Sequence, residues 1–309
     1  MVLGAGGKMG LHLCLMLRRA LDQLGRSDRV LAVSRFSTLR DSATFAERGI
    51  EALPCDLNDA ASVTRLPEAP TIFFLAGVKF GTAASPGLLH ATNVEIPQRV
   101  AARFKTSRII AFSTGCVYPF VTAASGGATE TTPPQPVGDY ALSCLAREQA
   151  FTAAAAEFGN PVALIRLNYS VEFRYGLLVD IAQAVMQGRP IDVTTGYVNV
   201  IWQTDAVAHV IQSLAIAGSP AVPINITGTA TLSVRDLATR FGAVLQRPVT
   251  FTGQEKETAW LNNATRSHQL FGPPPTSVDT MIRWVSAWQL HGGETWGKPT
   301  GFEKRDGRF

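Results

Sequence analysis

The sequence lacks several features that would define its class at once. No apolar run in its 309 residues reaches the length of about 18 that crosses a bilayer, and no charged segment followed by an apolar one suggests a signal peptide. Four cysteines without metal-type spacing and five histidines without an HExxH pattern indicate reduced thiols and no metal site. We therefore expect a soluble, cytoplasmic protein with no membrane partner.

The sequence also has no block of like charge. Its net charge of +4 and its pI near 9.0 arise from lysines and arginines that are scattered along the chain. This balance does not require a nucleic-acid partner, and it suits small anionic molecules such as phosphates. A chain of this length can bury one large core or two coupled ones.

The most informative stretch that is present covers residues 1–10, MVLGAGGKMG. Three apolar residues run into Gly4, Gly7 and Gly10, and apolar residues at helical spacing follow. A strand that turns into a helix at a dinucleotide phosphate needs positive φ at one glycine and no Cβ at another. The amides at the start of the helix then face the pyrophosphate. The stretch predicts a dinucleotide-binding turn, with a flexible glycine turn as the alternative.

Two residues inside this turn argue against a different phosphate site. A P-loop fits poorly because Lys8 is followed by Met9, where a magnesium-binding hydroxyl would be needed. We place both residues at the dinucleotide instead. The strand before the turn is short, with Met1 already inside it, so we expect residues to be missing upstream.

The end of the next strand bears on the choice of cofactor. Residues 30–33 are apolar and are followed by Ser34 and Arg35. An acidic residue here would accept a hydrogen bond from the ribose 2′-hydroxyl, whereas an arginine suits a 2′-phosphate. The sequence therefore favours NADP over NAD, unless Arg35 is only a solvated loop residue.

Two later strand ends carry residues suited to ligand contact. Asp56 and Leu57 end a short strand in the position that flanks an adenine ring in such folds. Residues 71–75 form an unbroken apolar run, which is typical of a parallel strand buried on both faces. Small residues at its carboxyl end let a ligand approach, and a lysine lies at the rim. These residues are Ala76, Gly77 and Lys79.

The middle of the chain continues the alternation of strands and helices. Residues 88–104 predict a helix that carries Asn93, and the apolar segment RIIAFST predicts a strand that ends in Ser113 and Thr114. Their hydroxyls are expected to face the same ligand crevice. The alternation predicts an α/β fold, a Rossmann-type doubly wound parallel sheet with right-handed crossovers.

Loop and helix-start signals complete this pattern. The segment 121–138 is rich in Gly, Thr and Pro and predicts a long loop that acts as a lid or contacts substrate. The following helix begins at Tyr140. Asp205 and Ser233 are each expected to cap a later helix.

The regular alternation of predicted strands and helices ends after the sixth predicted strand, so we expect two lobes. Residues 1–167, with 198–230 returning to them, are expected to form the dinucleotide-binding domain. Residues 168–197 and 231–309 are expected to form a smaller substrate-binding lobe. The last sixty residues are expected to cover the carboxyl edge of the sheet.

Taken in order, these features resemble the extended short-chain dehydrogenase/reductases, the NAD(P)-dependent epimerase/dehydratase family. The resemblance rests on the glycine turn, the Asp56–Leu57 pair, Asn93 and the segments STGCVYP, RLNYS and VIWQTDAVAHVI. It also rests on Thr114 and Tyr140, which lie 26 residues apart. The resemblance covers nearly the whole chain. It implies an oxidoreductase or epimerase/dehydratase that acts on a sugar, sugar acid or nucleotide-sugar, and a possible homodimer.

The resemblance also implies the roles of the central residues, with one departure. Tyr140 would be the general acid/base, and Thr114 would orient the substrate oxygen. Asn93 and Tyr140 would also contact the cofactor. The family has a lysine four residues after the tyrosine, which binds the nicotinamide ribose and lowers the tyrosine pKa, but this chain has Cys144. Because a free phenol has a pKa of about 10, a tyrosine that acts as a base near neutral pH needs a nearby cation.

Three interpretations of this departure stay open. Another cation substitutes, with Lys79 as the first candidate and Arg166 and Arg147 after it. Alternatively, Tyr140 acts only as an acid or hydrogen-bond donor, which suits carbonyl reduction or elimination. In the third interpretation the chemistry is lost, and the chain is an NADP(H)-binding sensor or regulatory protein. A nucleophilic Cys144 is disfavoured against a packed small apolar side chain, because no histidine neighbours it in sequence.

Polar and aromatic residues after residue 167 suit a carbohydrate-like small-molecule substrate. The resemblance places Asn168 at both cofactor and substrate, although Tyr169 and Trp202 could equally belong to the core. A basic cluster for a diphosphate is not identifiable, so a smaller polyol-like substrate stays open. The expected substrate contacts are Lys79, Thr114, Asn168, Tyr169, Arg174, Asn199 and Trp202.

Overall fold

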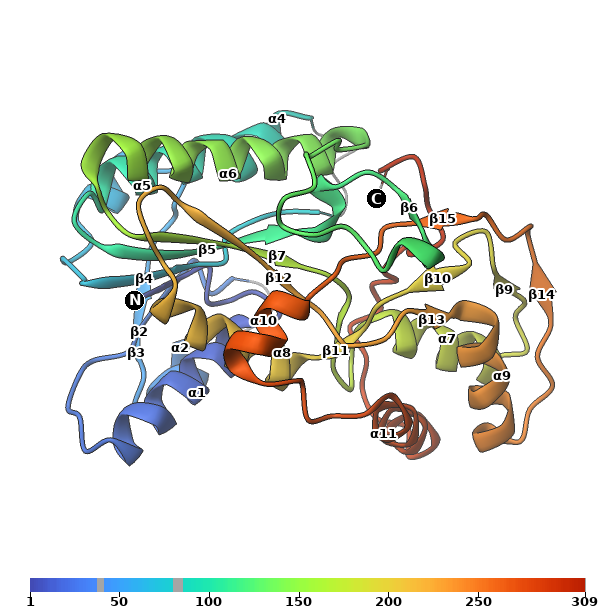
Figure 1. Cartoon of the computed structure of the whole chain (residues 1–309). Helices are drawn as coiled ribbons and strands as arrows, with labels where there is room; N and C mark the ends of the chain where they lie inside the picture. The colour runs from blue at the N-terminus through green and yellow to red at the C-terminus, as the bar shows by residue number, and fades with distance from the viewer. Residues whose placement is uncertain (38–41, 80–85, 309) are drawn as a thin grey trace. The chain divides into compact units, whose positions relative to one another are not determined.

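The computed structural model describes residues 1–37, 42–79 and 86–308 (Figure 1). The fold is mixed α/β, and its central sheet has seven strands in the order β12-β7-β5-β4-β1-β2-β3. The strand order reverses between β1 and β4, because the chain adds β2 and β3 on one side of β1 and continues with β4 on the other. The strands of this sheet are β1 (Val2–Leu3), β2 (Leu31–Ser34), β3 (Glu51–Pro54), β4 (Thr71–Phe74), β5 (Arg108–Thr114), β7 (Val162–Leu167) and β12 (Val222–Ile226).

The chain divides into two compact units. The first contains residues 1–113, 142–165 and 207–224, and the second contains the remainder. Residues 114–141, which the sequence assigned to the dinucleotide-binding domain, group with the second unit. The helices are α1 (Gly10–Gln23), α2 (Ser42–Ala46), α3 (Ala60–Thr64), α4 (Pro86–His90), α5 (Ile96–Arg103), α6 (Gly138–Phe158), α7 (Leu177–Met186), α8 (Gln203–Gln212), α9 (Val234–Leu245), α10 (Thr265–Phe271) and α11 (Val278–Leu290).

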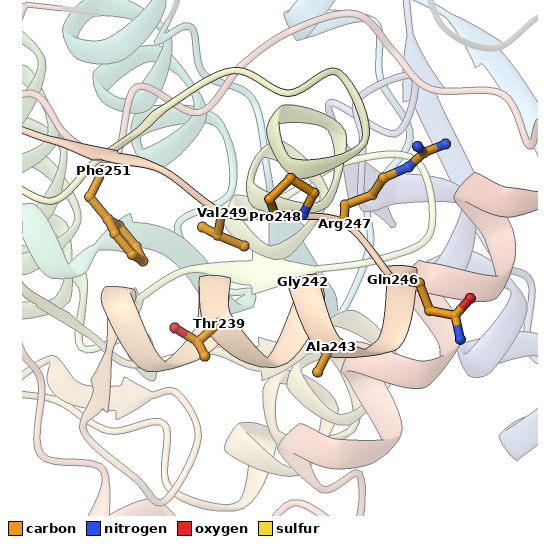
Figure 2. Close-up of a pocket in the computed structure, with 8 residues that line it drawn as sticks. All are labelled: Thr239, Gly242, Ala243, Gln246, Arg247, Pro248, Val249 and Phe251. Carbon is orange, nitrogen blue, oxygen red and sulfur yellow. The ribbon is translucent and has the colours of Figure 1, made fainter.

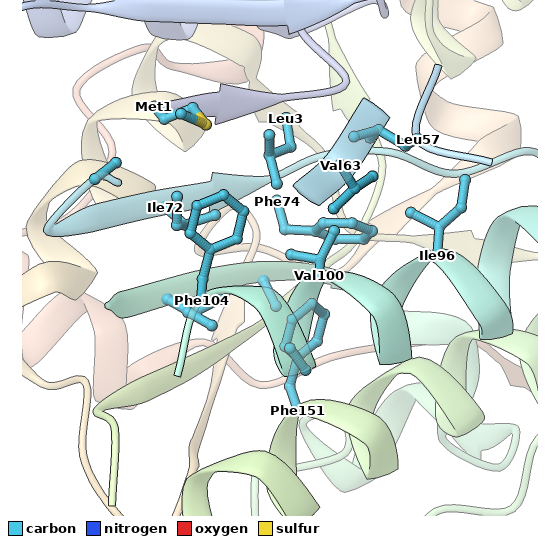
Figure 3. Packing of buried hydrophobic residues seen from close by; sticks show 14 of the residues in the cluster. Met1, Leu3, Leu57, Val63, Ile72, Phe74, Ile96, Val100, Phe104 and Phe151 are labelled. Atoms are coloured by element: carbon cyan, nitrogen blue, oxygen red, sulfur yellow. The ribbon is translucent and has the colours of Figure 1, made fainter. Parts of the chain in front are cut away.

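The first unit is built on parallel strand pairs with apolar side chains on both faces. Val2 of β1 lies opposite Ala32 on one side and Phe73 on the other, and both pairings are parallel. On one face of the sheet the core joins β4 to α5 and α6, as Figure 3 shows. The rings of Phe74 and Phe151 meet edge to face there, with centroids 5.1 Å apart. The unbroken apolar runs of β4 and β5 follow from burial on both faces.

The predicted helix over residues 88–104 is real but not uniform. Between α4 and α5 the chain forms one π-helical turn, η1 (Ala91–Glu95). Such a turn widens the helix and is often found at functional sites. Asn93 lies in this turn and is completely buried. The distortion therefore coincides with a residue that the sequence had singled out.

The second unit carries four two-stranded pairings and the helices α7, α9 and α11, which contact one another. Its apolar core includes Leu178 of α7, Phe241 of α9 and Val285 of α11. Ser233 caps α9 as predicted, because its Oγ accepts a hydrogen bond from the Asp236 amide. The remaining strands are β6 (Val121–Thr122), β8 (Ser170–Val171), β9 (Ile191–Asp192), β10 (Tyr197–Val198), β11 (Ile201–Trp202), β13 (Leu232–Ser233), β14 (Phe251–Thr252) and β15 (Thr258–Ala259).

Asp205 does not cap its helix as predicted. Helix α8 begins at Gln203, so Asp205 is its third residue rather than the residue before the first turn. Its carboxylate instead accepts a hydrogen bond from the Thr276 amide, 71 residues further along the chain. The side chain therefore fastens the segment before α11 to α8. A carboxylate in the first turn still suits the positive end of the helix.

Candidate functional site

The glycine turn after β1 has the shape that the sequence predicted. Gly4 has a φ of +85°, and a Cβ there would lie 2.6 Å from the Ala76 nitrogen at the end of β4. At Gly10 a Cβ would lie 2.1 Å from the carbonyl oxygen of Ala5. Because the backbone passes so closely at both points, no side chain fits at either glycine. The turn leads directly into α1, whose first amides are free of side-chain caps. This arrangement fits a dinucleotide pyrophosphate.

The end of β2 contributes to the same turn. A Cβ at Gly6 would lie 2.5 Å from the Ser34 Oγ, so this serine hydroxyl lies directly against the turn. The Phe36 amide also donates a hydrogen bond to the Ser34 Oγ, at a distance of 3.5 Å. Arg35 is exposed, and among the described residues it has no hydrogen bond or ion pair. Its guanidinium is therefore available to a phosphate. The sequence had missed Gly6, which stands outside the spacing of the other three glycines.

The Asp56–Leu57 pair after β3 has two separate roles. Asp56 Oδ1 accepts hydrogen bonds from the Asn58 amide at 2.9 Å and from the Asn58 side chain at 3.2 Å, which forms a local turn. The Leu57 side chain lies in the core, where Figure 3 labels it. Its carbonyl oxygen accepts a hydrogen bond from Arg99. Only backbone groups of Leu57, and the second oxygen of Asp56, are left for an adenosine.

Asn93 is the centre of a hydrogen-bonded knot with Val78, Ser143 and Arg147 in the first unit, and every hydrogen-bonding group of its side chain has a partner. Its Oδ1 accepts hydrogen bonds from the Val78 amide at 2.9 Å and from Arg147 Nη2 at 2.8 Å. Its Nδ2 donates to the Val78 carbonyl and to Ser143 Oγ, both at 2.9 Å. A primary amide has two donors and two principal acceptor positions, so the side chain has no capacity left for a cofactor. The expected direct contact becomes a supporting one: Asn93 fixes the segment after β4.

Arg147, one of the four residues of this knot, is also buried. Its Nη1 donates to the Phe112 carbonyl in β5 at 3.0 Å, and its guanidinium lies 5.7 Å from the centre of the Phe74 ring. A Cβ on Gly77 would lie 2.6 Å from its Nη2, so the guanidinium lies close to the chain just after β4. The sequence named Arg147 only as a substitute cation. Its neighbours Ser143 and Glu148 were missed, although both are buried polar residues on α6.

The two hydroxyls that end β5 have different partners. Ser113 Oγ donates to the carboxylate of Glu148 at 2.5 Å, which engages it inside the first unit. Thr114, in the second unit, accepts a hydrogen bond at Oγ1 from the Cys116 amide at 3.2 Å. That bond uses one lone pair and leaves the Thr114 O–H free to donate. Thr114 is therefore the better of the two for holding a substrate oxygen.

The structure places the expected acid/base and its neighbours on known elements. Tyr140 is half-buried in the first turn of α6. Cys144 lies one turn later on the same helix and is completely buried, as expected of a packed small side chain. Lys79 is half-buried in the segment that follows β4, and Lys8 and Met9 are half-buried at the start of α1.

A buried polar chain occupies the second unit. Arg166 Nη1 donates to the Tyr118 hydroxyl at 2.7 Å, and that hydroxyl donates to Asn225 Oδ1 at 2.9 Å. Asn168 Nδ2 donates to the Trp260 carbonyl, and the Asn168 backbone amide donates to Ile226. Arg166 is thus engaged by a phenol, which makes it a weaker candidate for a substitute cation. The Asn168 carboxamide oxygen stays available.

Several expected substrate contacts have structural partners instead. The guanidinium of Arg174 bonds both carboxylate oxygens of the buried Glu172, at 3.1 and 3.2 Å. The Asn199 carboxamide joins the Ala230 carbonyl to the Asn262 amide. Trp202 packs edge to face on Phe173, with ring centroids 5.0 Å apart, and belongs to the core of the second unit. These three residues therefore support the unit through these partners, and their contact with a substrate stays a prediction.

Tyr169 keeps an unusual conformation. Its φ is +37°, a region that non-glycine residues rarely adopt and that tends to mark functional sites. Burial of the hydroxyl raises its pKa well above the ordinary range, and the charge of Arg305 opposes that rise. The hydroxyl is consequently protonated at any physiological pH and can only donate or accept hydrogen bonds.

An open depression of about 550 Å³ lies on the surface of α9 in the second unit, as Figure 2 shows. Thr239, Gly242 and Ala243 of the helix form one wall, and Pro248 and Val249 of the following segment form the other. None of its lining residues is a predicted site residue. It holds no titratable pair or convergent set of polar groups, so its size alone gives it no chemistry.

Other kinds of site are not found in the described parts of the chain. Within residues 1–37, 42–79 and 86–308, no group of three or more metal-ligating side chains gathers. Among the same residues, no helix has both the length and the apolarity needed to span a membrane. The four cysteines are buried, and none of them forms a disulfide with another described residue.

The sheet order and the glycine turn together define a Rossmann-type, doubly wound dinucleotide-binding fold. The family model described as "NAD dependent epimerase/dehydratase family" matches residues 1–182. The chain belongs to this family. No curated protein matches the sequence.

Solved structures with similar folds cover most of the chain at low identity. MoeE5 in complex with UDP-glucose and NAD is 20% identical with a TM-score of 0.75, and the match covers 94% of this chain and 98% of that one. UDP-glucuronic acid 4-epimerase from Bacillus cereus with NAD is 18% identical with a TM-score of 0.76 and the same coverage. DesIV, a dTDP-glucose 4,6-dehydratase from Streptomyces venezuelae, is 18% identical with a TM-score of 0.78, covering 94% and 96%.

Proposed function

We propose that the chain is a nicotinamide-dependent oxidoreductase or epimerase/dehydratase that acts on a sugar, sugar acid or nucleotide-sugar. The observation that carries the proposal is the glycine turn, where Gly4 faces the Ala76 backbone with no room for a Cβ. Family membership over residues 1–182 supports it. The similar structures that hold NAD with UDP-glucose or UDP-glucuronic acid support the cofactor and substrate class.

In this proposal the chain's own residues hold the cofactor and move one proton. A bound nicotinamide ring accepts or returns a hydride. The first amides of α1, after Gly10, hold the pyrophosphate. Tyr140 gives or takes the substrate proton at its phenol oxygen, while the Thr114 O–H, left free by the Cys116 bond, orients the substrate oxygen. Lys79 is proposed to lower the pKa of Tyr140, and Asn168 and Tyr169 to contact substrate.

We propose NADP(H) as the preferred cofactor, with NAD(H) as the alternative. The exposed Arg35 at the end of β2, beside Ser34 and the glycine turn, suits a 2′-phosphate. Arg35→Ala should weaken NADPH binding about tenfold, which corresponds to about 1.4 kcal/mol, and leave NADH binding within about twofold. Titration of the nucleotide fluorescence measures both. Equal affinities in the unchanged protein would reverse the preference.

The catalytic part is tested by turnover. The purified protein is screened against sugars, sugar acids and nucleotide-sugars with both cofactors, and Tyr140→Phe is expected to abolish any turnover while leaving cofactor binding intact. Full activity in Tyr140→Phe would remove the tyrosine from the mechanism. Lys79→Met is expected to lower turnover most near neutral pH, and an unchanged pH profile would remove Lys79.

A second candidate function follows from Cys144. The resemblance places this buried thiol at the family's lysine position, where it would supply no positive charge. A protein that has lost the proton transfer would serve as an NADP(H)-binding sensor or regulator. The sensor predicts saturable cofactor binding, no turnover of any panel substrate, and no effect of Tyr140→Phe on any measured property.

A further inference from the structure

Arg147 is a buried cation with no anionic partner among the residues that the structure describes. Only 5% of it is exposed, and its hydrogen bonds go to two neutral oxygens, the Phe112 carbonyl and Asn93 Oδ1. Among the described residues no carboxylate forms an ion pair with it, and its Nε has no acceptor. Its neighbour Glu148 directs its carboxylate to Ser113 instead. Because a buried charge normally keeps a counter-charge, this position needs an explanation.

The guanidinium lies beside the carboxyl ends of β4 and β5, near the Phe74 ring and the Phe112 carbonyl. A Cβ on Gly77 would lie 2.6 Å from its Nη2, and the preceding residue, Ala76, leaves no room for a Cβ on Gly4. The cation and the glycine turn therefore approach the same short piece of backbone, all within the first unit. The β4 and β5 strands follow the point at which the strand order reverses. Doubly wound sheets bind one mononucleotide on each half at this point, and β1 to β3 form the first half.

We infer that Arg147 places a fixed positive charge beneath the nicotinamide half of the cofactor and so favours the reduced form over the oxidised form. The inference rests on the proposed cofactor binding. The oxidised ring carries one positive charge, and it becomes neutral when it accepts a hydride, that is, one proton and two electrons from a substrate carbon. The pyrophosphate charge is the same in both forms. A cation below the ring therefore opposes only the oxidised form.

This charge makes the bound oxidised cofactor a stronger hydride acceptor. It acts over a longer range than a hydrogen bond, so it does not require contact with the ring. Two unit charges about 10 Å apart in surroundings of effective dielectric constant about 20 change a binding ratio by roughly an order of magnitude. The charge of Arg147 thus sets the preference for the reduced over the oxidised form of the cofactor, while Asn93 and the Phe112 carbonyl hold the guanidinium in place.

The test measures dissociation constants for the oxidised and reduced forms of the same cofactor, and for AMP. Arg147→Met and the neutral but polar Arg147→Gln are each expected to lower the ratio of the oxidised to the reduced constant about tenfold. Arg147→Lys keeps the charge and is expected to keep the ratio within about threefold. AMP affinity is expected to stay unchanged, because AMP occupies the first half of the sheet only.

Arg103→Met is the matched control. Arg103 also bonds a backbone carbonyl, that of Leu66, and lies 5.0 Å from a phenylalanine ring centre, but its charge is paired with Glu68 in the segment before β4. Arg103→Met should leave the ratio of the oxidised to the reduced dissociation constant unchanged. If both constants rise together in Arg147→Met and Arg147→Gln, the residue is only a structural support and the inference is wrong. An unchanged ratio in folded Arg147 variants would also show that the inference is wrong. If the unchanged protein binds no dinucleotide, the proposed function itself fails.

Discussion

The knot around Asn93 yields the sharpest stability prediction. Asn93→Ala removes four hydrogen bonds inside the first unit. The Val78 amide loses its side-chain acceptor, and the buried guanidinium of Arg147 loses one of its two acceptors. Each buried polar group left unpaired costs about 1–3 kcal/mol, and more when it is charged. Because partial relaxation and trapped water recover some of this, we expect a loss of about 3–5 kcal/mol in the free energy of unfolding.

Equilibrium unfolding in urea measures this loss, with Asn160→Ala as a matched control. Asn160 is also buried in the first unit, but among the described residues its side chain makes a single bond, from Nδ2 to the Ser107 carbonyl at 3.2 Å, and its Oδ1 has no donor. Its truncation should cost about 1 kcal/mol. If Asn93→Ala costs no more than Asn160→Ala, the knot does not stabilise the segment after β4 and the reasoning is refuted.

Three further predictions concern separate elements. Gly4→Ala should weaken cofactor binding at least about tenfold, because its Cβ would meet the Ala76 backbone at 2.6 Å and its φ is +85°; an unchanged dissociation constant would show that the turn holds no ligand. Tyr118→Phe, which removes the hydroxyl between Arg166 and Asn225, should cost about 2–3 kcal/mol in urea unfolding, and a loss below about 0.5 kcal/mol would contradict the buried network. Burial raises the pKa of Cys14 from 9.0 to about 12. The thiol therefore deprotonates first in the unfolded chain, and the stability that Cys14 contributes falls as the pH rises from about 9 towards 12. Cys14→Ala should lose less stability than the unchanged protein between pH 8 and pH 10.5, and parallel losses would contradict the burial.

The features predictable from sequence are those that depend on local pattern. The glycine turn at Gly4 and Gly10 needs only φ and Cβ arguments, and the buried strands β4 and β5 show as unbroken apolar runs. Ser233 caps α9 because a serine before a helix has a local partner, the Asp236 amide. The α/β class and the family followed from the order of these local signals.

The features that were missed depend on partners distant in sequence. Asn93 is held by Ser143 and Arg147, 50 and 54 residues away, so its saturated amide leaves no trace in the local sequence. Arg174 is a local exception: the buried Glu172, two residues earlier, takes up its charge in a turn that the alternation of strands did not predict. Trp202 could have been core or substrate contact, and only its packing on Phe173 and Trp284 decides for the core.

The central claim is that the turn at Gly4 and Gly10 holds a nicotinamide dinucleotide. Titration of the folded protein with NADPH and NADH, followed by the fluorescence of the nucleotide, tests it most directly. The account predicts saturable binding of at least one of them, with NADPH the tighter. A protein that is folded by circular dichroism and binds neither would contradict it.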